Sequence, residues 1–401
     1  MLKSVSSKYG SKIILAVAVL SLVGAWFYGR VDVGSGIIDN LDALAPSASS
    51  FTHLEGSDIG DGLIYRAEDG SGNPIGYITA TEGAGYGGPM TVMVAWSLDN
   101  TILGMIVPQH NEDDLWWRDV DDAFFTQYLD RRYNEPLLIG QDINAISGST
   151  VSSVGVASGV SAARTLYSRF IGDPYPLPSK PINFGGAEIA LIVGLSMAFA
   201  FRTVPFFRGR RWTRYITLAY GFFVLGFWLV IPLSLSNLAA WLVHYTPPLE
   251  TFIIMYILVL GIVGLAVVFG KNYYCYWLCP FSSFQELINP IPEGRLKPQV
   301  KIGRWLRRFK FLLLWLALMA IFIYRNPGIA SFEPWNTLFT LKGELVNFVL
   351  LGMVMISATL FYNFWCFYLC PVGASLELIL KTRKAVVSLC KRIQKTCVKS
   401  W

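Results

Sequence analysis

Apolar positions are concentrated in six long stretches, and the segments between them are more polar. Each stretch holds 16 or more mostly apolar residues, at 13–29, 187–204, 215–234, 251–269, 309–325 and 345–364. A helix of that length is about long enough to cross ~30 Å of hydrocarbon, so the pattern predicts six membrane spans. The first stretch follows three lysines like a signal peptide. It lacks a small-x-small cleavage site at its exit, which favours a retained anchor.

The region between the first two stretches has a different pattern, with short segments separated by turn residues. Four segments predict strands of an antiparallel sheet: 63–67, 75–80, 90–96 and 102–107. Segments 119–133 and 151–170 have the spacing or composition of helices, and four prolines at 174–181 predict a stiff linker. The expected fold is a polytopic α-helical membrane protein with an extracytoplasmic α+β domain.

Composition and charge give this architecture an orientation. Of 401 residues, 53% are hydrophobic and 15% charged, as expected for a membrane protein with one soluble domain. Residues 31–186 hold 20 acidic and 7 basic side chains, whereas the rest of the chain holds 7 and 26. Lys and Arg accumulate on cytoplasmic loops, so both termini are expected inside and the acidic domain outside. Topology explains the basic loops, so we expect membrane lipid and no nucleic acid as a partner.

A turn of four small polar residues lies directly ahead of the helix expected at 151–170. It consists of Ser147, Gly148, Ser149 and Thr150. Ser and Thr are ordinary helix N-caps, and the turn taken alone is best explained in that way. The same position offers free backbone N–H groups and the positive end of a helix dipole, which suit a phosphate. The Thr150 hydroxyl is therefore either a cap or an attachment point.

Two Cys-x-x-x-Cys-Pro motifs, ending at Pro280 and Pro371, occur 91 residues apart. Their flanks repeat too, because Asn-Tyr-Tyr precedes the first motif, Asn-Phe-Trp precedes the second, and Glu-Leu-Ile follows each. Cysteines four residues apart share a helix face, and the Pro breaks a helix or starts a new one. Each pair is therefore expected at the cytoplasmic end of a span.

The duplication decides between two interpretations of the cysteines. One pair in an apolar stretch is best explained as buried apolar side chains, but a repeated pair favours a redox or metal site. The four thiolates match the ligand count of one Fe–S cluster, or of one tetrahedral iron or zinc, and are those of Cys275, Cys279, Cys366 and Cys370. A disulfide is disfavoured on the reducing cytoplasmic side. Cys390 and Cys397 lack ligand spacing and are interpreted as structural or incidental.

The chain has three histidines, His53, His110 and His244, and one of them is near a predicted span. A bis-His haem inside the membrane is therefore not expected. His244 stands beside Trp241 and Tyr245 and is interpreted as an outer-interface residue, with a quinone contact as the alternative.

The outer domain resembles the periplasmic FMN-binding domain family. That family's Asp-x-x-Ser/Thr-Gly-Ala-Thr motif aligns with residues 144–150, with Asn144 in place of Asp and Ser149 in place of Ala. The resemblance implies that a flavin transferase esterifies the FMN phosphate to Thr150. It extends to the loop at 85–89 and to the segment after 107, which makes Gly87, Gly88 and His110 further candidates for flavin contact.

The whole arrangement resembles the NosR/NirI-type family of membrane flavoproteins. It is most similar to the short forms of that family, such as the C-type accessory proteins of reductive dehalogenases, because only a basic tail follows Pro371. The resemblance implies transmembrane electron transfer between quinol, or a cytoplasmic donor, and an FMN that serves a periplasmic reductase. The rival interpretation is a non-catalytic accessory or redox-sensing protein with structural metal or none. The expected parts are an anchor (1–30), a periplasmic FMN-binding domain (31–183), a five-helix membrane domain (184–380) and a basic cytoplasmic tail (381–401).

Overall fold

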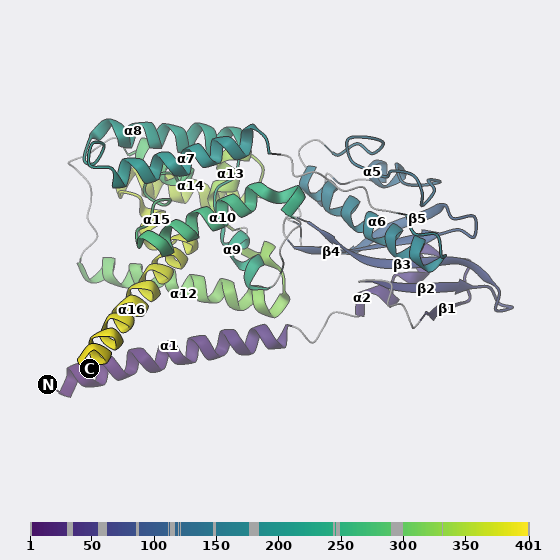
Figure 1. The fold of residues 1–401 in the computed structure, drawn as a ribbon, viewed down its shortest axis with the longest axis horizontal. Coiled ribbons are helices and arrows are strands. Elements are labelled where there is room, and N and C mark those ends of the chain that lie inside the picture. Colours follow the sequence, from purple (N-terminus) through teal and green to yellow (C-terminus); the bar gives the residue numbers. More distant parts are fainter. Residues whose placement is uncertain are drawn as a thin grey trace.

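The protein has two parts, a helical domain and a smaller sheet domain joined end to end (Figure 1). The structure is a computed structural model. It describes residues 2–399 except 30–34, 55–61, 86–87, 111, 113–116, 119, 121, 147–149, 176–183, 244, 246–248, 290–299 and 331.

The sheet domain is built on an antiparallel meander in which neighbours in sequence are neighbours in space. Its strands are β1 (Ser50–His53), β2 (Leu63–Glu68), β3 (Pro74–Ala84), β4 (Pro89–Trp96) and β5 (Ile102–Gln109). The turn between β2 and β3 is closed by Asp69, whose Oδ1 accepts hydrogen bonds from Ser71 N at 2.8 Å and Asn73 N at 2.9 Å. Two short helices, α2 (Ser35–Ile38) and α3 (Leu41–Leu44), contact β5, and Leu41 packs with apolar side chains of β2, β3 and β4.

One long helix, α6 (Thr150–Phe170), packs against β3 and β4. Its small residues allow a close approach: a Cβ on Gly159 would lie 2.7 Å from Val92 Cβ, and one on Gly155 would lie 2.9 Å from Gly85 Cα. Polar atoms tie the same surfaces together, because Thr81 Oγ1 donates to Gly159 O at 2.9 Å. The Ala, Gly and Ser content of this segment is therefore explained by helix-to-sheet packing.

The sequence predictions for this domain are mostly confirmed. The four expected strands and the helix after residue 150 are present. The edge strand β1 was not predicted, because it is only four residues long and its residues are mostly exposed. The helix expected at 119–133 was wrong in extent: in the described part of this segment the helix is α5 (Asp122–Thr126), and the chain then turns, with Asp130 at φ 59°. The aromatic residues Phe124 and Tyr128 had suggested a helix face, but they fill the core from a helical turn and the loop after it.

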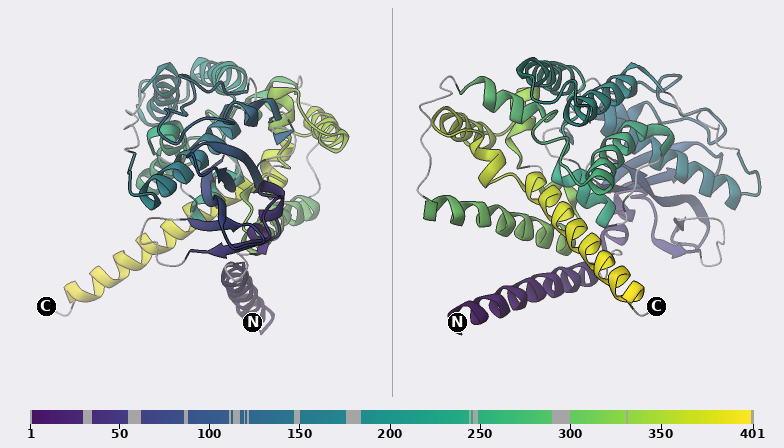
Figure 2. Two further views of the ribbon diagram at one scale, coloured as in Figure 1. Left: turned by 90° about the vertical axis from the view of Figure 1, so that its right-hand side faces the viewer. Right: turned by 60° about the vertical axis from the view of Figure 1, so that its left-hand side comes forward.

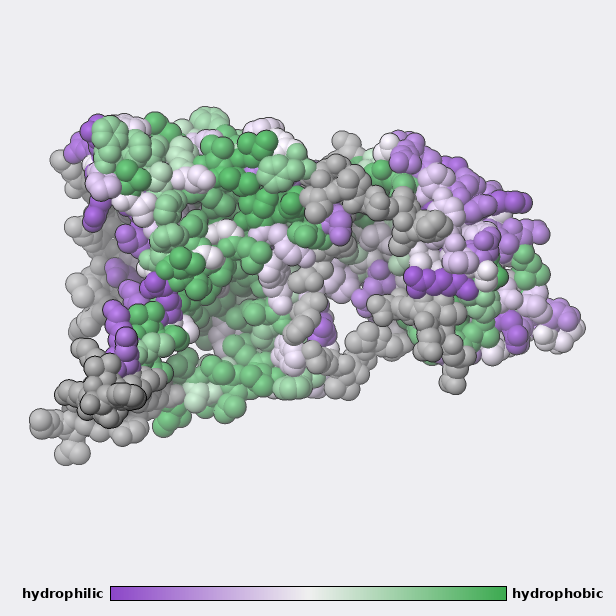
Figure 3. Space-filling view, in the orientation of Figure 1, coloured by the Kyte–Doolittle hydropathy of each residue, from purple (hydrophilic) through white to green (hydrophobic). Residues whose placement is uncertain are grey.

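Each of the six apolar stretches lies wholly or mostly on helical segments. The helical domain contains α1 (Leu2–Tyr28), α7 (Gly186–Thr203), α8 (Arg211–Tyr220), η1 (Gly221–Trp228), α9 (Leu235–Leu242), α10 (Leu249–Phe269), α11 (Pro280–Leu287), α12 (Val300–Tyr324), η2 (Pro327–Ala330), α13 (Pro334–Thr340), α14 (Leu345–Leu360), α15 (Phe364–Tyr368) and α16 (Pro371–Lys399). Hydrophobic side chains cover the visible face of this domain, whereas the sheet domain is largely hydrophilic (Figure 3).

Two helical segments among the described residues, 186–203 and 252–269, are long and apolar enough to cross a membrane alone. A third span is possible if α13 and α14, which are bent by 99° to each other, act as one broken unit. The apolar part of α1 is shorter, and the stretch at 215–234 is interrupted: η1 is a π-helix, and Val230 follows it with φ 50°. Pro232 comes directly after this break and cannot donate a helical hydrogen bond.

The described part of the basic tail is helical. Helix α16 begins inside the helical domain and runs out of it (Figure 2). Near its middle, Arg383 Nη2 donates to Val268 O at 2.8 Å, and Arg383 Nε donates to Val267 O. A cation therefore satisfies free carbonyl groups at the C-terminal end of α10, where the helix dipole favours positive charge.

Candidate functional site

The expected flavin residues lie where the sheet domain meets the helical domain. Thr150 begins α6, and this end of the helix is directed toward the helical domain (Figure 1). Ser147, Gly148, Ser149 and Gly87 lie outside the described residues, as does His244. Upstream of the turn, Asn144 N donates to Gln127 Oε1 at 2.8 Å and Ile146 N donates to Ser153 Oγ at 3.1 Å. The segment that leads into α6 is thus held at both ends.

The glycine loop after β3 lies against the first turns of α6. Gly85 N donates to Gly88 O at 3.2 Å, which closes the loop, and the Gly85 backbone is in close contact with Gly155. Two residues that are 70 positions apart in the sequence are therefore brought together by the fold, as a shared flavin site requires. Gly88 is buried in this loop.

A carboxylate and a stacked aromatic pair complete this region. Glu112 is 7% exposed, and one of its oxygens accepts a hydrogen bond from Ser152 Oγ in the first turn of α6. A negative side chain is stabilised at that end of a helix. His110 stacks on Trp117, with ring centroids 4.0 Å apart and planes at 25°. His110 is thus packed on a neighbouring ring rather than being an isolated surface residue.

The helical domain touches this region through Tyr245, whose hydroxyl donates to Gly85 O at 3.1 Å. Tyr245 follows α9 on a segment held by other helices, because Trp26 Nε1 donates to Leu242 O at 3.1 Å and Arg325 Nη2 donates to Val243 O at 3.0 Å. Burial, and secondly the nearby Glu112 carboxyl, raise the pKa of Tyr245, so the hydroxyl remains a donor at neutral pH.

The two cysteine motifs form matching loops. Leu278 N and Cys279 N both donate to Tyr274 O, and Leu369 N and Cys370 N both donate to Trp365 O, at 2.8–2.9 Å. We expected each pair on one helix face at the end of a span, and this was wrong in detail. Cys275 lies in a turn, Cys366 lies in the short α15, and the second cysteine of each pair precedes a new helix that begins at Pro. Pro at the first helical position explains the sharp restart.

The four cysteines are half-buried within the helical domain. Burial raises the pKa of every thiol, to about 12 for Cys366. Burial is the largest cause of the raised pKa of Cys279 and of Cys370, and the neighbouring Cys366 thiol is the second. Because Cys279 and Cys366 belong to different motifs, the two motifs lie near one another. Without a cation these thiols are held neutral, and a bound metal displaces their protons.

Across the described residues, no three His, Cys, Asp or Glu side chains form a ready-made site for one metal ion. Four thiols match the ligand count of one four-iron cluster or of one tetrahedral metal ion. N–H groups already point at two sulfurs: Gln285 Nε2 is 3.1 Å from Cys366 Sγ, and Gly373 N is 3.3 Å from Cys370 Sγ. Such donors stabilise metal-bound thiolates.

The duplication also includes an ion pair beside each loop. Arg214 of α8 pairs with Glu286, and Lys310 Nζ of α12 is 2.6 Å from Glu377 Oε2, 91 residues later. The acid belongs to the repeat in both cases, and the base comes from another helix. Each loop is therefore anchored to a different part of the domain.

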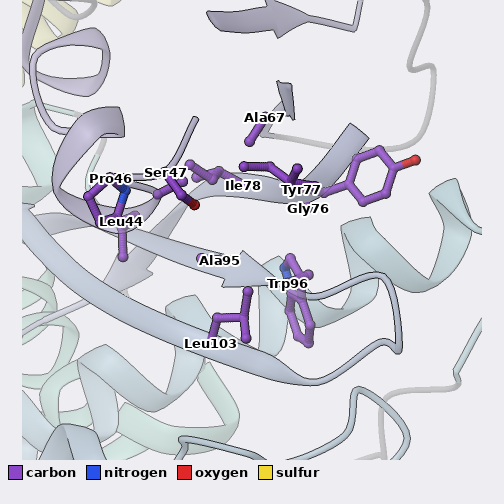
Figure 4. A pocket seen from close by; sticks show the side chains of 12 residues that line it. Leu44, Pro46, Ser47, Ala67, Gly76, Tyr77, Ile78, Ala95, Trp96 and Leu103 are labelled. Atoms are coloured by element: carbon purple, nitrogen blue, oxygen red, sulfur yellow. The ribbon is translucent and has the colours of Figure 1, made fainter. Parts of the chain in front are cut away.

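The sheet domain contains a cavity of about 220 Å³ away from these residues (Figure 4). It lies between the segment after α3 and strands β3 and β4, and Pro46, Tyr77 and Trp96 are among its lining residues. It includes none of the expected flavin residues, so we do not assign the flavin to it.

Comparison with known proteins agrees with both halves of this site. Residues 85–165 match the family described as FMN-binding domain, and residues 251–299 and 345–395 match the family described as 4Fe-4S binding domain. The chain therefore contains an FMN-binding domain and two segments of a 4Fe-4S binding domain. Over parts of its length it is similar to proteins of the NosR/NirI type.

Individual relatives are similar over parts of the chain. Protein NirI of Paracoccus denitrificans is 30% identical over 145 residues, which are 33% of this chain and 21% of NirI. Regulatory protein NosR of Pseudomonas aeruginosa is 30% identical over 125 residues, 29% of this chain and 18% of NosR. Putative electron transport protein YccM of Escherichia coli is 27% identical over 124 residues, 27% of this chain and 34% of YccM. The chain thus matches only about a fifth of NirI and NosR.

Three residues of this region were not identified from the sequence. Ser152 looked like any small helix residue, and Tyr245 was noted only as a neighbour of His244. Gln285 stands directly before the repeated Glu-Leu-Ile. Its counterpart 91 residues later is Leu376, and that mismatch inside a repeat was a signal that could have identified it.

Proposed function

We propose that this protein carries electrons across a bacterial inner membrane, between quinol or a cytoplasmic donor and an FMN that serves a periplasmic reductase. One observation carries the proposal: an FMN-binding domain is joined, through Tyr245 and Gly85, to a helical domain with four half-buried cysteines. FMN and an Fe–S cluster supply electron transfer when bound. The protein's own residues hold and orient them.

The proposed topology has the FMN domain in the periplasm and both termini in the cytoplasm, with six membrane-crossing segments. The charge asymmetry supports it, because Lys and Arg mark the cytoplasmic side. The described ends of α1 and α16 lie together, away from the sheet domain, which agrees with this orientation (Figure 1). The proposed parts are the anchor at 1–30, the FMN domain at 31–183, the membrane domain at 184–380 and the tail at 381–401.

The proposed flavin anchor is Thr150, esterified to the FMN phosphate by a flavin transferase. Its support is positional, because Thr150 begins a 21-residue helix whose first N–H groups lack helical partners. We assign Ser147, Gly148 and Ser149 to the same anchor, and Gly87, Gly88 and His110 to flavin contacts. The Gly85–Gly155 contact supports this grouping, because it holds the glycine loop beside the beginning of α6.

The proposed metal ligands are Cys275, Cys279, Cys366 and Cys370, with a [4Fe–4S] cluster as the centre. The thiols lie inside the helical domain, and Cys370 packs in an apolar cluster with Phe332, Leu351 and Val354. The Tyr245 contact joins the FMN domain to the helical domain that holds these cysteines.

The test begins with FMN, iron and acid-labile sulfide in the full chain, purified without oxygen. The protein is then placed in lipid vesicles and mixed with a reduced quinol analogue or a low-potential donor while flavin absorbance is followed. We expect flavin reduction in the wild type and a much slower reduction in Cys279→Ser. A flavin that no donor reduces through the helical domain would exclude the conduit.

The second candidate is an accessory or redox-sensing protein for such a reductase. The name of one relative, regulatory protein NosR, favours it. In that case Cys279→Ser would leave flavin reduction unchanged, while the maturation or expression of the reductase would depend on the flavin state. The same vesicle assay therefore separates the two candidates.

A further inference from the structure

Gln285 breaks the symmetry of the duplicated cysteine motif. It lies on α11, which follows the first motif, yet its side chain reaches the second motif. Gln285 is fully buried at 0% exposed. Its Nε2 donates to Cys366 Sγ at 3.1 Å, and its Oε1 accepts from Trp365 N at 3.1 Å. One carboxamide therefore bridges the two repeats at the sulfur itself.

The orientation of this carboxamide follows from its partners. The backbone N–H of Trp365 can only donate, so the Gln285 oxygen must face it. The amino group then faces Cys366 Sγ, and it also lies 3.4 Å from Phe281 O, which accepts its second hydrogen. The flipped orientation would place N–H against N–H and oxygen against oxygen, and it is excluded on that ground.

The repeat-related position cannot act in the same way. Leu376 stands 91 residues after Gln285 and is also fully buried, but an alkyl side chain donates no hydrogen bond. In the first loop the backbone N–H groups are bound by a nearby residue instead. Asn272 Oδ1 accepts hydrogen bonds from Tyr274 N at 3.0 Å and Cys275 N at 2.9 Å. The Cys366 sulfur therefore has a carboxamide donor from the other repeat, and Cys275 has no equivalent at position 376.

We propose that Gln285 is a positioning residue that tunes a metal centre bound through Cys366 and makes the two halves of the duplicated site inequivalent. The inference rests on the iron centre of the proposed function. A hydrogen bond to a ligating sulfur stabilises the extra negative charge of the reduced state, so it raises the reduction potential. The half of the centre bound through Cys366 is thereby favoured for the electron.

The test uses Gln285→Leu, which gives position 285 the side chain of its repeat partner. Iron and acid-labile sulfide are measured first, and the reduced centre is then titrated against potential by electron paramagnetic resonance. We expect full iron, a more negative midpoint potential and a changed spectrum, with flavin content and the flavin midpoint unchanged. Full iron with an unchanged midpoint and spectrum would overturn the inference.

Two further variants make the result specific. Gln285→Glu keeps an oxygen for Trp365 N but replaces the N–H donor with a negative charge, so its midpoint should be more negative still. Asn289→Leu is the matched control: it removes a buried carboxamide whose Nδ2 donates to Ala358 O at 2.7 Å, away from the sulfurs, and should leave the midpoint unchanged. An equal shift in the control would assign the effect to packing and overturn the inference.

Loss of iron from both Gln285 variants would also overturn it, because Gln285 would then be needed for assembly rather than tuning. Wild-type protein without iron would overturn the proposed function and this inference together. An iron-loaded Gln285→Leu protein with the wild-type midpoint would overturn this inference alone.

Discussion

Replacing Tyr245 with Phe removes one hydroxyl from the contact between the two domains. The ring and its packing remain, and the segment stays held through Leu242 and Val243. The lost interaction is the hydrogen bond to Gly85 O, 3.1 Å long in the wild type. A single intramolecular hydrogen bond contributes about 0.5–1.5 kcal/mol net. We expect the free energy of docking to fall by about 1 kcal/mol, which is roughly fivefold in the docking equilibrium.

Hydrogen exchange measures this change directly, because in the fast-closing regime the exchange rate follows the population of the open state. Deuterium uptake should increase about fivefold in rate for segments 84–90 and 240–250 and stay unchanged in the core of the sheet. Tyr215→Phe is the control, since its ring is 66% exposed on α8 and should change neither segment. Equal uptake in Tyr245→Phe and wild type would refute the reasoning.

The pH dependence of docking provides a second check on the same hydroxyl. The pKa of Tyr245 is raised above its ordinary value of 10.0 when the domains are docked, mainly by burial. The docked state therefore holds the proton more tightly than the undocked state. Docking should be constant at neutral pH and weaken as pH rises above about 10, and this loss should be absent in Tyr245→Phe.

Three further predictions concern the flavin, the iron and the core of the sheet domain. Thr150→Ala should abolish flavin fluorescence that survives denaturing electrophoresis; a remaining fluorescent band would place the attachment elsewhere. Cys279→Ser should lower bound iron, measured by elemental analysis, while Cys390→Ser on the exposed part of α16 should not; equal iron in both would remove Cys279 from the ligand set. Gly159→Ala should destabilise the sheet domain by about 1–3 kcal/mol, because the new methyl group overpacks the interface with β4, whereas Gly70→Ala, whose added atom has 3.6 Å of space, should change thermal unfolding little.

The position of the chain's main features could be read without the structure. Four strands and α6 follow from short apolar runs, turn residues and a long segment of Ala, Val and Ser, and all are present. The cysteine loops follow from a 91-residue repeat of residue types. The pattern of apolar residues predicted secondary structure less well where those residues are apolar because they pack in the core. Phe124 lies on a short helix and Tyr128 in the turn after it, and both pack in the core of the sheet domain. Their separation of four residues is the same as that of two residues on one face of a longer helix.

The sequence by itself predicted the two candidate sites of this protein, a turn before a helix for the flavin and a duplicated set of four thiols, because both predictions depend on residue type and spacing. Only the tertiary structure decided what those residues meet. The Gly85 loop lies against α6, Tyr245 joins that loop to the helical domain, and Gln285 crosses from one repeat to a sulfur of the other. These contacts join residues that are 70, 160 and 81 positions apart. Hydrogen bonds and close packing at that separation depend on how the helices are placed, which no local pattern encodes.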